Sequence, residues 1–227
     1  MTSWPLAGAS AVSTELYRQL EISRGVTAVI GSGGKTSLIA FLARTLPGTV
    51  IVCTSTHIYP AAGMPLLERI SVMPARRVCV GTAAAHGKLT APLQPFEELA
   101  QLADYVLVEA DGSRGLPLKA HLPYEPVIPP CTGQTIKVVG LTGLGQPIRR
   151  AAHRSAQYAA LCGCREEDPA TPERAARVLN SEALADRYVL NQADDPERQA
   201  LAVDLSVRLS APAAVTCLQQ MVFKLSE

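Results

Sequence analysis

The sequence predicts an α/β fold with a parallel sheet, or a mostly parallel one, and helices on both faces. Short apolar segments rich in β-branched residues alternate with stretches of helical spacing, the order of a sheet with crossover helices. Most of these segments are continuously apolar rather than alternating, as in strands buried on both faces. A glycine-rich turn over 31–34 also separates the first apolar segment from the first helical one.

The elements follow in order along the chain. Helices are expected over 37–43, 95–102 and 195–209, and the last two begin beside a proline and an acidic residue, which are helix start signals. The segment 142–185 has no strand candidate, so we expect a helical insertion in the C-terminal half. With no internal repeat or linker, residues 1–227 are expected to form one domain. The expected strands are 26–30, 49–54, 77–80, 105–108, 136–141, 187–190 and 214–217.

Composition and charge exclude several classes of function. The 227 residues carry a net charge of +1, and their 21 basic residues are scattered, so nucleic acid is not expected as a partner. The N-terminus has no basic region followed by an apolar segment, and no window approaches a membrane span. We therefore expect a cytoplasmic protein without a membrane partner, its six cysteines reduced.

The glycine-rich turn has the order of residues that phosphate binding requires. Glycines let backbone N–H groups turn toward an anion, and the following helix N-terminus adds partial positive charge. In this interpretation Lys35 reaches the β and γ phosphates of ATP or GTP, and the Thr36 hydroxyl coordinates Mg²⁺. The alternative is a strand-to-helix turn without a ligand. The candidate nucleotide-binding residues of this loop are Gly31, Ser32, Gly33, Gly34, Lys35, Thr36 and Ser37.

The spacing of this loop departs from the common Walker form. The pattern G-x-x-x-x-G-K-[ST] would require glycine at position 29, which is Val29. The loop is instead a shortened G-x-x-G-K-[ST], of the kind found in murein-peptide ligases. We still predict a P-loop NTPase-like fold, with a cradle that is tighter or differently wrapped.

Polar side chains follow two of the predicted strands. Glu109 and Asp111 follow the segment 105–108, and a period of two directs both toward the crevice where ligands bind in open α/β sheets. They are candidates for holding Mg²⁺ and for activating a nucleophile; the alternative is that they form turns or cap a helix. The second strand ends in three further candidate substrate contacts, which are Thr54, Thr56 and His57.

Two weaker patterns lie in the C-terminal half. Asn191 and Asp194 follow an apolar strand, where N-K-x-D sequences read guanine, but Gln192 replaces the lysine, and a plain turn is the alternative. His153 and Arg154 lie with Arg149 and Arg150 on an expected helix and are candidate contacts for an anionic substrate; a solvated helix face is the alternative.

A pair of cysteines in the same half forms a C-x-C pattern. Cys162 and Cys164 could handle a soft metal or selenium together with His153 upstream. Two thiols at this spacing do not make a zinc site by themselves, and cysteine usually packs as a small hydrophobic residue. We expect packing residues here.

Taken together, these motifs resemble the YqeC-type selenium-dependent hydroxylase accessory proteins. The resemblance rests on 31–36, 54–58, 108–120, 125–129 and His153-Arg154, and its most specific part is Glu109 to Lys119. It implies nucleotide binding through the glycine loop and a role in maturing molybdenum hydroxylases that need a selenium-containing cofactor. Ser32 departs from the family pattern, which usually has glycine there. Arg114 joins Lys35, Glu109 and Asp111 as a catalytic candidate, and Lys119 joins the candidate substrate contacts.

Three hypotheses of function follow. The first is an Mg²⁺-dependent NTPase or phosphoryl transferase that serves molybdenum hydroxylase maturation, with the hydroxylase or its cofactor-maturation proteins as partners. The second is a nucleotide-gated module that delivers a cofactor or apoenzyme without hydrolysis. The third is an ATP-dependent ligase that forms an acyl phosphate. The sequence leaves open ATP or GTP, the second substrate, and whether the chain forms a homo-oligomer.

Overall fold

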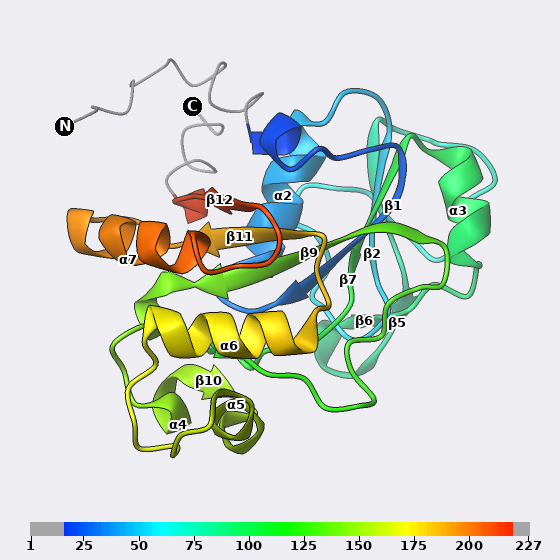
Figure 1. Ribbon diagram of the computed structural model, residues 1–227. Helices are drawn as coiled ribbons and strands as arrows, with labels where there is room; N and C mark the ends of the chain where they lie inside the picture. Colours follow the sequence, from blue (N-terminus) through cyan, green and yellow to red (C-terminus); the bar gives the residue numbers. More distant parts are fainter. Residues whose placement is uncertain (1–15, 220–227) are drawn as a thin grey trace.

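A computed structural model describes residues 16–219 (Figure 1). Its centre is an eight-stranded sheet in which every neighbouring pair of strands is parallel. All seven expected strands belong to it, so the predicted α/β class is confirmed; the fifth begins at Thr132 rather than at 136. In spatial order the strands are β12 (Ala213–Val215), β11 (Arg187–Asn191), β9 (Thr132–Gly140), β1 (Gly25–Gly31), β7 (Tyr105–Glu109), β2 (Val50–Thr54), β4 (Arg77–Val80) and β3 (Leu66–Leu67).

Helices cover both faces of this sheet. On one face α2 (Lys35–Thr45) packs Leu38, Phe41 and Leu42 onto apolar side chains of β1, β2, β7 and β9. On the other face lie α3 (Phe96–Leu102), α6 (Pro172–Glu182) and α7 (Pro196–Ser206). Side chains alternate along each strand, so Val29 faces α2 while Val26 faces α3. The apolar core is therefore two layers, one on each face of the sheet.

Start signals in the sequence explain where two of these helices begin. The Asp195 side chain accepts a hydrogen bond from the Arg198 N–H, and Pro196 occupies the first turn of α7. Thr171 caps α6 in the same way, bonding the Arg174 N–H at 3.2 Å. Such caps satisfy N–H groups that have no partner inside the helix.

The segment 142–185 contains helices joined by loops, and one short strand. It contains α6, α4 (Ile148–Ala151) and α5 (Ser155–Cys162), preceded by the 3₁₀ turn Leu141–Gly143. Our expectation of a helix through His153 and Arg154 is wrong, because Ala152–His153 forms the short strand β10 beside β8 (Leu118–Lys119). The His153 carbonyl accepts the Ala120 N–H at 3.1 Å, and Arg154 adopts a left-handed φ of 64° before α5 begins. Tertiary hydrogen bonding thus outweighs local helical spacing here.

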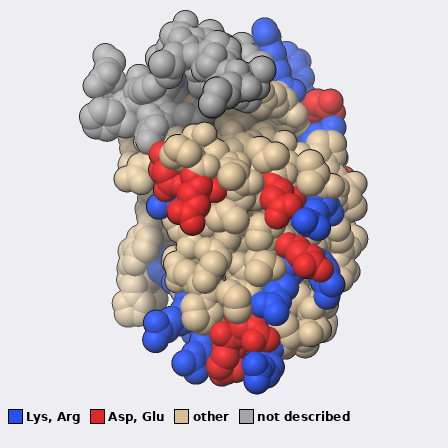
Figure 2. Space-filling view, turned by 60° about the vertical axis from the view of Figure 1, so that its left-hand side comes forward, with Lys and Arg blue, Asp and Glu red and all other residues tan. Residues whose placement is uncertain are grey.

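Further short elements lie at the periphery. The strands β5 (Thr82–Ala83) and β6 (Leu89–Thr90) form an antiparallel pair around the 3₁₀ turn Ala85–Gly87. None of the helices within 16–219 has the length and apolarity needed to cross a membrane. Acidic and basic side chains are interspersed on the face that Figure 2 brings forward.

Candidate functional site

The glycine loop lies between β1 and α2 at the carboxyl edge of the sheet. Gly33 and Gly34 have φ values of 83° and 130°, which favour glycine. A Cβ on Gly33 would lie 2.3 Å from the Gly140 Cα, and one on Gly34 would lie 2.3 Å from the Asn191 Nδ2. Neither position has room for a side chain. Within the described chain, no side chain caps the start of α2, so its first N–H groups are directed toward any anion at this edge.

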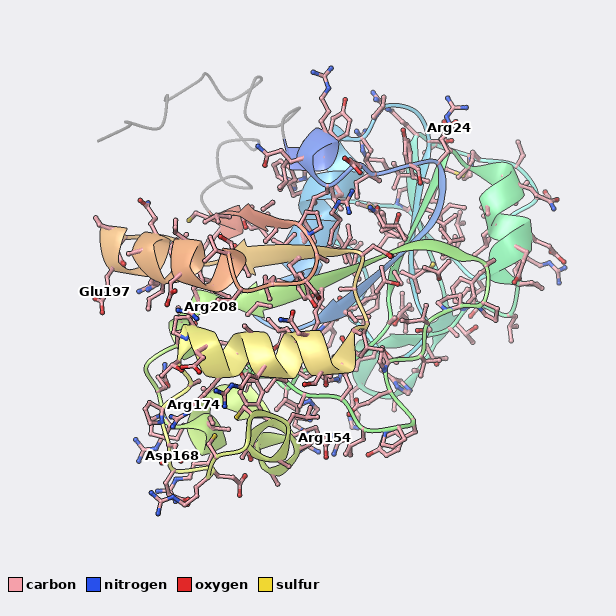
Figure 3. All side chains as sticks on the ribbon, in the orientation of Figure 1. Arg24, Arg154, Asp168, Arg174, Glu197 and Arg208 are labelled. Atoms are coloured by element: carbon pink, nitrogen blue, oxygen red, sulfur yellow. The ribbon has the colours of Figure 1, made fainter. Side chains whose placement is uncertain are left out.

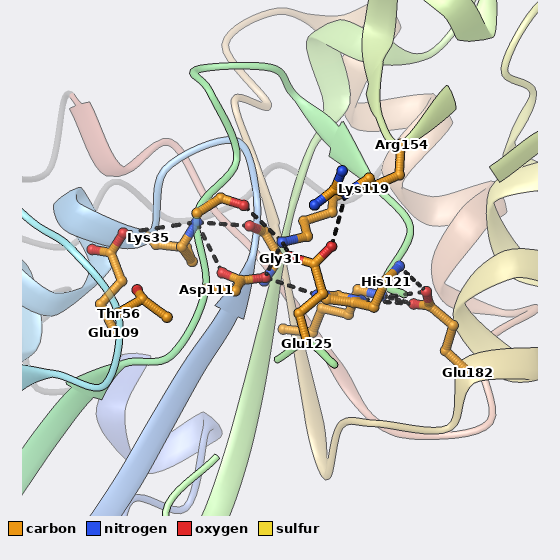
Figure 4. Close-up of polar contacts among 12 residues, drawn as sticks. Gly31, Lys35, Thr56, Glu109, Asp111, Lys119, His121, Glu125, Arg154 and Glu182 are labelled. Atoms are coloured by element: carbon orange, nitrogen blue, oxygen red, sulfur yellow. Dashed lines mark hydrogen bonds and ion pairs between the residues drawn. The ribbon is translucent and has the colours of Figure 1, made fainter. Parts of the chain in front are cut away.

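Lys35 begins α2 and turns back over the loop. Its Nζ lies 2.7 Å from the Gly31 carbonyl oxygen, 3.1 Å from Asp111 Oδ1 and 3.8 Å from Glu109 Oε1 (Figure 4). The Lys35 side chain is 3% exposed. Its positive charge is therefore held by two carboxylates beside the loop.

Glu109 and Asp111 lie in the same region but contact different groups. Glu109, the last residue of β7, accepts a hydrogen bond from the Thr36 hydroxyl at 3.1 Å. Asp111 Oδ2 accepts the Gly31 N–H at 2.9 Å and lies 3.1 Å from the Lys119 Nζ. Thr36 and Glu109 thus place two hard oxygen ligands side by side, whereas Asp111 contacts N–H groups and cationic side chains.

The electrostatics of the two carboxyls differ accordingly. Burial raises the pKa of Glu109, and the nearby Lys35 and Thr36 offset only part of that rise. Burial also acts to raise the pKa of Asp111, but the hydrogen bond from His121 and the charges of Lys35 and Lys119 outweigh it. The pKa of Asp111 is held well below its usual range.

His121 is a site residue that the sequence analysis missed. Its Nε2 lies 2.7 Å from Asp111 Oδ2, and its Nδ1 lies 3.2 Å from a carboxylate oxygen of Glu182, at the end of α6. Glu182 also pairs with the buried Lys137. A continuous chain of contacts therefore runs from Lys35 through Asp111 and the His121 imidazole to Glu182 and Lys137. Only one signal in the sequence points to His121. It lies two residues after Lys119, and in an extended chain residues two apart direct their side chains to the same side.

A second cluster extends from Asp111 toward β10. Glu125 accepts hydrogen bonds from Lys119 Nζ at 2.9 Å and from Arg154 Nε at 2.9 Å. The Arg154 guanidinium also lies over the exposed Tyr124 ring, 5.7 Å from its centroid. Figure 4 shows Lys119, Glu125 and Arg154 side by side next to Asp111. Lys119 and Arg154, two of the candidate substrate contacts, are therefore joined through Glu125.

His153 and Arg114 lie around this cluster. The His153 Nδ1 is buried without a hydrogen-bond partner in the part of the chain that the structure describes. Burial, and then the charges of Lys119 and Arg154, lower the pKa of His153, which favours a neutral imidazole. Arg114 is exposed, has a left-handed φ of 52°, and is close enough for its charge to act on His153.

The polar residues after β2 serve mainly to join strand ends. The buried Thr54 hydroxyl donates to the Glu109 carbonyl at 2.7 Å and accepts the Thr56 N–H at 2.9 Å. It thereby fixes the end of β2 against the end of β7. Thr56 is half-buried and borders Glu109 in Figure 4, whereas His57 is exposed.

Asn191 ties the glycine loop to the segment that follows β12. Its Nδ2 donates to the Gly33 carbonyl at 2.7 Å, and its Oδ1 accepts the Leu218 N–H at 2.9 Å and the Thr216 hydroxyl at 3.2 Å. Asp194 is exposed and pairs with Arg198 at 2.9 Å. Asn191 therefore contacts the loop directly, while Asp194 lies at the surface.

The two remaining loop serines differ in their surroundings. The Ser32 N–H is bonded to the Val138 carbonyl at 2.9 Å, and its buried hydroxyl has no hydrogen-bond partner among residues 16–219. Ser37 is half-buried in the first turn of α2. Ser32 thus fixes the loop against β9 through its backbone.

These features define a parallel α/β protein of P-loop NTPase-like architecture, with a glycine loop, a lysine and two carboxyls at the carboxyl edge of the sheet. A family model described as YqeC protein matches residues 27–156. The chain is also 34% identical over 155 residues to the YqeC protein of Escherichia coli strain K12, a match that covers 61% of this chain and 60% of that protein. The chain belongs to the YqeC family, as the sequence motifs predicted.

Proposed function

We propose that this protein binds a nucleoside triphosphate with Mg²⁺ at the glycine loop and transfers or hydrolyses its terminal phosphate. The observation that carries the proposal is the position of the Lys35 ammonium, held by Asp111, Glu109 and the Gly31 carbonyl above an uncapped helix start. A lysine in this position can exchange carboxylate oxygens for phosphate oxygens, because both are anionic acceptors. The first N–H groups of α2 would contact the same phosphates.

Thr36 and Glu109 are the residues suited to hold Mg²⁺. The Thr36 hydroxyl and the Glu109 carboxylate lie 3.1 Å apart, and oxygen ligands of this kind are those that Mg²⁺ prefers. When bound, Mg²⁺ would neutralise phosphate charge as the terminal group transfers. Asp111 would act on Lys35 and the Gly31 N–H, and so would position the loop rather than take a proton.

The cluster around Glu125 supports an anionic second substrate. Arg154 retains two guanidinium nitrogens beyond the one that bonds Glu125, and Arg114 is exposed nearby. The neutral His153 imidazole, on which the charges of both arginines act, is suited to accept a proton from an incoming nucleophile. By its resemblance to accessory proteins, we place this activity in the maturation of selenium-dependent molybdenum hydroxylases.

A second candidate function is a nucleotide-gated binding module. One observation favours it: Asp111 Oδ2 is shared by Lys119, His121 and the Gly31 N–H, and Asp111 Oδ1 lies 3.1 Å from Lys35 Nζ, so this carboxylate is buried among groups of the protein itself. In that case nucleotide binding would only draw Lys35 away from Asp111. Steady-state phosphate release, with and without a hydroxylase partner, separates this module from the enzyme.

Titration with ATP and GTP, with and without Mg²⁺, tests the proposal directly. Lys35→Ala is expected to weaken binding by at least about tenfold, the scale of one lost charge-assisted contact. Lys88→Ala is the matched control, since Lys88 lies over the Tyr59 ring, 5.3 Å from its centroid, and should leave affinity unchanged. Equal affinity in the Lys35→Ala variant and the parent, with both folded by circular dichroism, would contradict the phosphate-loop assignment.

A further inference from the structure

Two thiols lie together at the end of α5, outside the site described above. Cys162 is the last residue of this helix, and Gly163 follows in a left-handed conformation with φ 68°. The Cys164 N–H then bonds the Ala159 carbonyl at 3.0 Å, which turns the chain back over the helix end. Figure 1 places α5 below α6, at the opposite side of the molecule from α2. The backbone turn itself therefore brings the two thiols together.

The distance between the sulfur atoms decides what the pair can form. Cys162 Sγ and Cys164 Sγ are 3.0 Å apart. A disulfide requires about 2.05 Å, so closure needs an approach of about 1 Å. Tetrahedral zinc with Zn–S bonds of about 2.3 Å would instead require the sulfurs to separate to about 3.8 Å. Within residues 16–219 no cluster of three or more metal-ligating side chains completes such a site.

We propose that Cys162 and Cys164 form a redox dithiol that closes reversibly to an intramolecular disulfide by exchange with a low-molecular-weight disulfide such as oxidised glutathione. The two thiols have unequal access to solvent, because Cys162 is 2% exposed and Cys164 is half-buried. Cys164 is therefore the attacking thiol and Cys162 the resolving one. Exchange of this kind requires a thiolate that can reach the external disulfide.

The reaction balances in two steps. The Cys164 thiolate attacks one sulfur of oxidised glutathione, breaks its S–S bond and releases one glutathione thiolate, which takes up the proton that Cys164 lost. The Cys162 thiol then gives its proton to solvent, and its sulfur attacks Cys164 Sγ and displaces the second glutathione as a thiolate, which takes up a proton from solvent. The two protein thiols lose two electrons in total, and oxidised glutathione gains them as two molecules of reduced glutathione.

The surroundings of the pair agree with this division of roles. Burial, followed by the hydrogen bond and the charge of Cys164, raises the pKa of the Cys162 thiol to about 12. Cys162 therefore keeps its proton near neutral pH, and the more exposed Cys164 is the thiol that meets the external disulfide. The charge of Arg174 on α6 (Figure 3) acts on Cys162 in the opposite direction and offsets a small part of that rise in pKa, which assists the resolving step. The disulfide would link residues only two apart, so it would act on the turn after α5 rather than on the whole fold.

The test uses the full, reduced chain incubated with oxidised glutathione near neutral pH, then quenched with acid, alkylated and digested for mass spectrometry. The expected product is a peptide in which Cys162 and Cys164 both escape alkylation and which lacks two hydrogen atoms. The Cys162→Ser variant should instead accumulate a glutathione adduct on Cys164 that does not resolve. Cys131→Ser is the matched control, because the half-buried Cys131 lies elsewhere and should not affect closure.

Three outcomes would overturn the proposal. One is that the parent protein keeps both thiols open to alkylation under conditions that form the adduct in Cys162→Ser. Another is that the Cys164 adduct persists in the parent as it does in the variant. The third is that Zn²⁺ alone binds with one ion per chain and protects both thiols. Should Cys162→Ser fail to fold by circular dichroism, Cys162→Ala provides the same comparison without a buried hydroxyl.

Discussion

Replacing Asp111 with asparagine tests whether the buried charges of the site depend on this one carboxylate. The side chain is 0% exposed and contacts the Gly31 N–H, Lys35, Lys119 and His121. Asparagine keeps the shape and one oxygen but removes the negative charge. Breaking a buried pair by removing one partner costs about 3–5 kcal/mol, because the other charge is left uncompensated.

The structure places the expected cost at the lower end of that range. Lys35 keeps Glu109 at 3.8 Å, and Lys119 keeps Glu125 at 2.9 Å, so both cations retain one carboxylate. We therefore expect Asp111→Asn to lower the free energy of unfolding by about 3 kcal/mol. Urea denaturation followed by circular dichroism measures this change. The exposed pair of Arg149 and Glu167 offers a control, because Glu167→Gln should cost less than about 1 kcal/mol.

The pH dependence supplies an independent check of the same charge. Since the pKa of Asp111 is lowered in the folded protein, its stabilisation is fully present above the ordinary carboxyl pKa of about 3.9 and is lost as the pH falls below it. Asp111→Asn should therefore flatten the acid side of the stability profile. A destabilisation no larger than that of Glu167→Gln would refute the reasoning. Additive effects of Asp111→Asn and Lys119→Met on the free energy of unfolding would also refute it, because two side chains in one ion pair should show a coupling energy in a double-mutant cycle.

Three further predictions concern ligand binding and the loop. Thr36→Ala should reduce the gain in nucleotide affinity that Mg²⁺ provides, and should change the affinity without Mg²⁺ less. If titrations show the same gain from Mg²⁺ in the variant and the parent, Thr36 is not a metal ligand. Asn191→Ala should lower the free energy of unfolding by about 3 kcal/mol, at about 1 kcal/mol for each of its three hydrogen bonds, and unchanged stability in urea denaturation would contradict this. The same variant should weaken nucleotide binding, measured by titration, because the Gly33 carbonyl loses its donor. Asp194→Asn should weaken GTP binding and spare ATP if Asp194 reads the base, whereas an unchanged ATP-to-GTP ratio in competition would make this segment a turn alone.

The sequence alone determined the parallel sheet and the position of the glycine loop, because both depend on local patterns. Continuous apolar segments identify strands that are buried on both faces, and the strand, glycines, lysine and helix follow one another within 26–43. The close pairing of Cys162 with Cys164 is also local, since one left-handed glycine between them sets it. Its chemistry was not evident from spacing, because the sulfur distance and the unequal burial appear only in the fold.

Tertiary structure alone decided how the charges of the site are shared. A period of two predicts one direction for Glu109 and Asp111, but β7 ends at Glu109, and the chain beyond it carries Asp111 to Lys119 and His121. His121 and Glu182 are 61 residues apart in sequence, so no local pattern joins them. No local pattern predicts β10 either, because its pairing with the distant strand β8 overrides the helical spacing at His153. Local secondary-structure propensities are worth fractions of a kcal/mol per residue. Buried charges and backbone groups that are left without partners cost several times more, so contacts between distant segments set the final geometry.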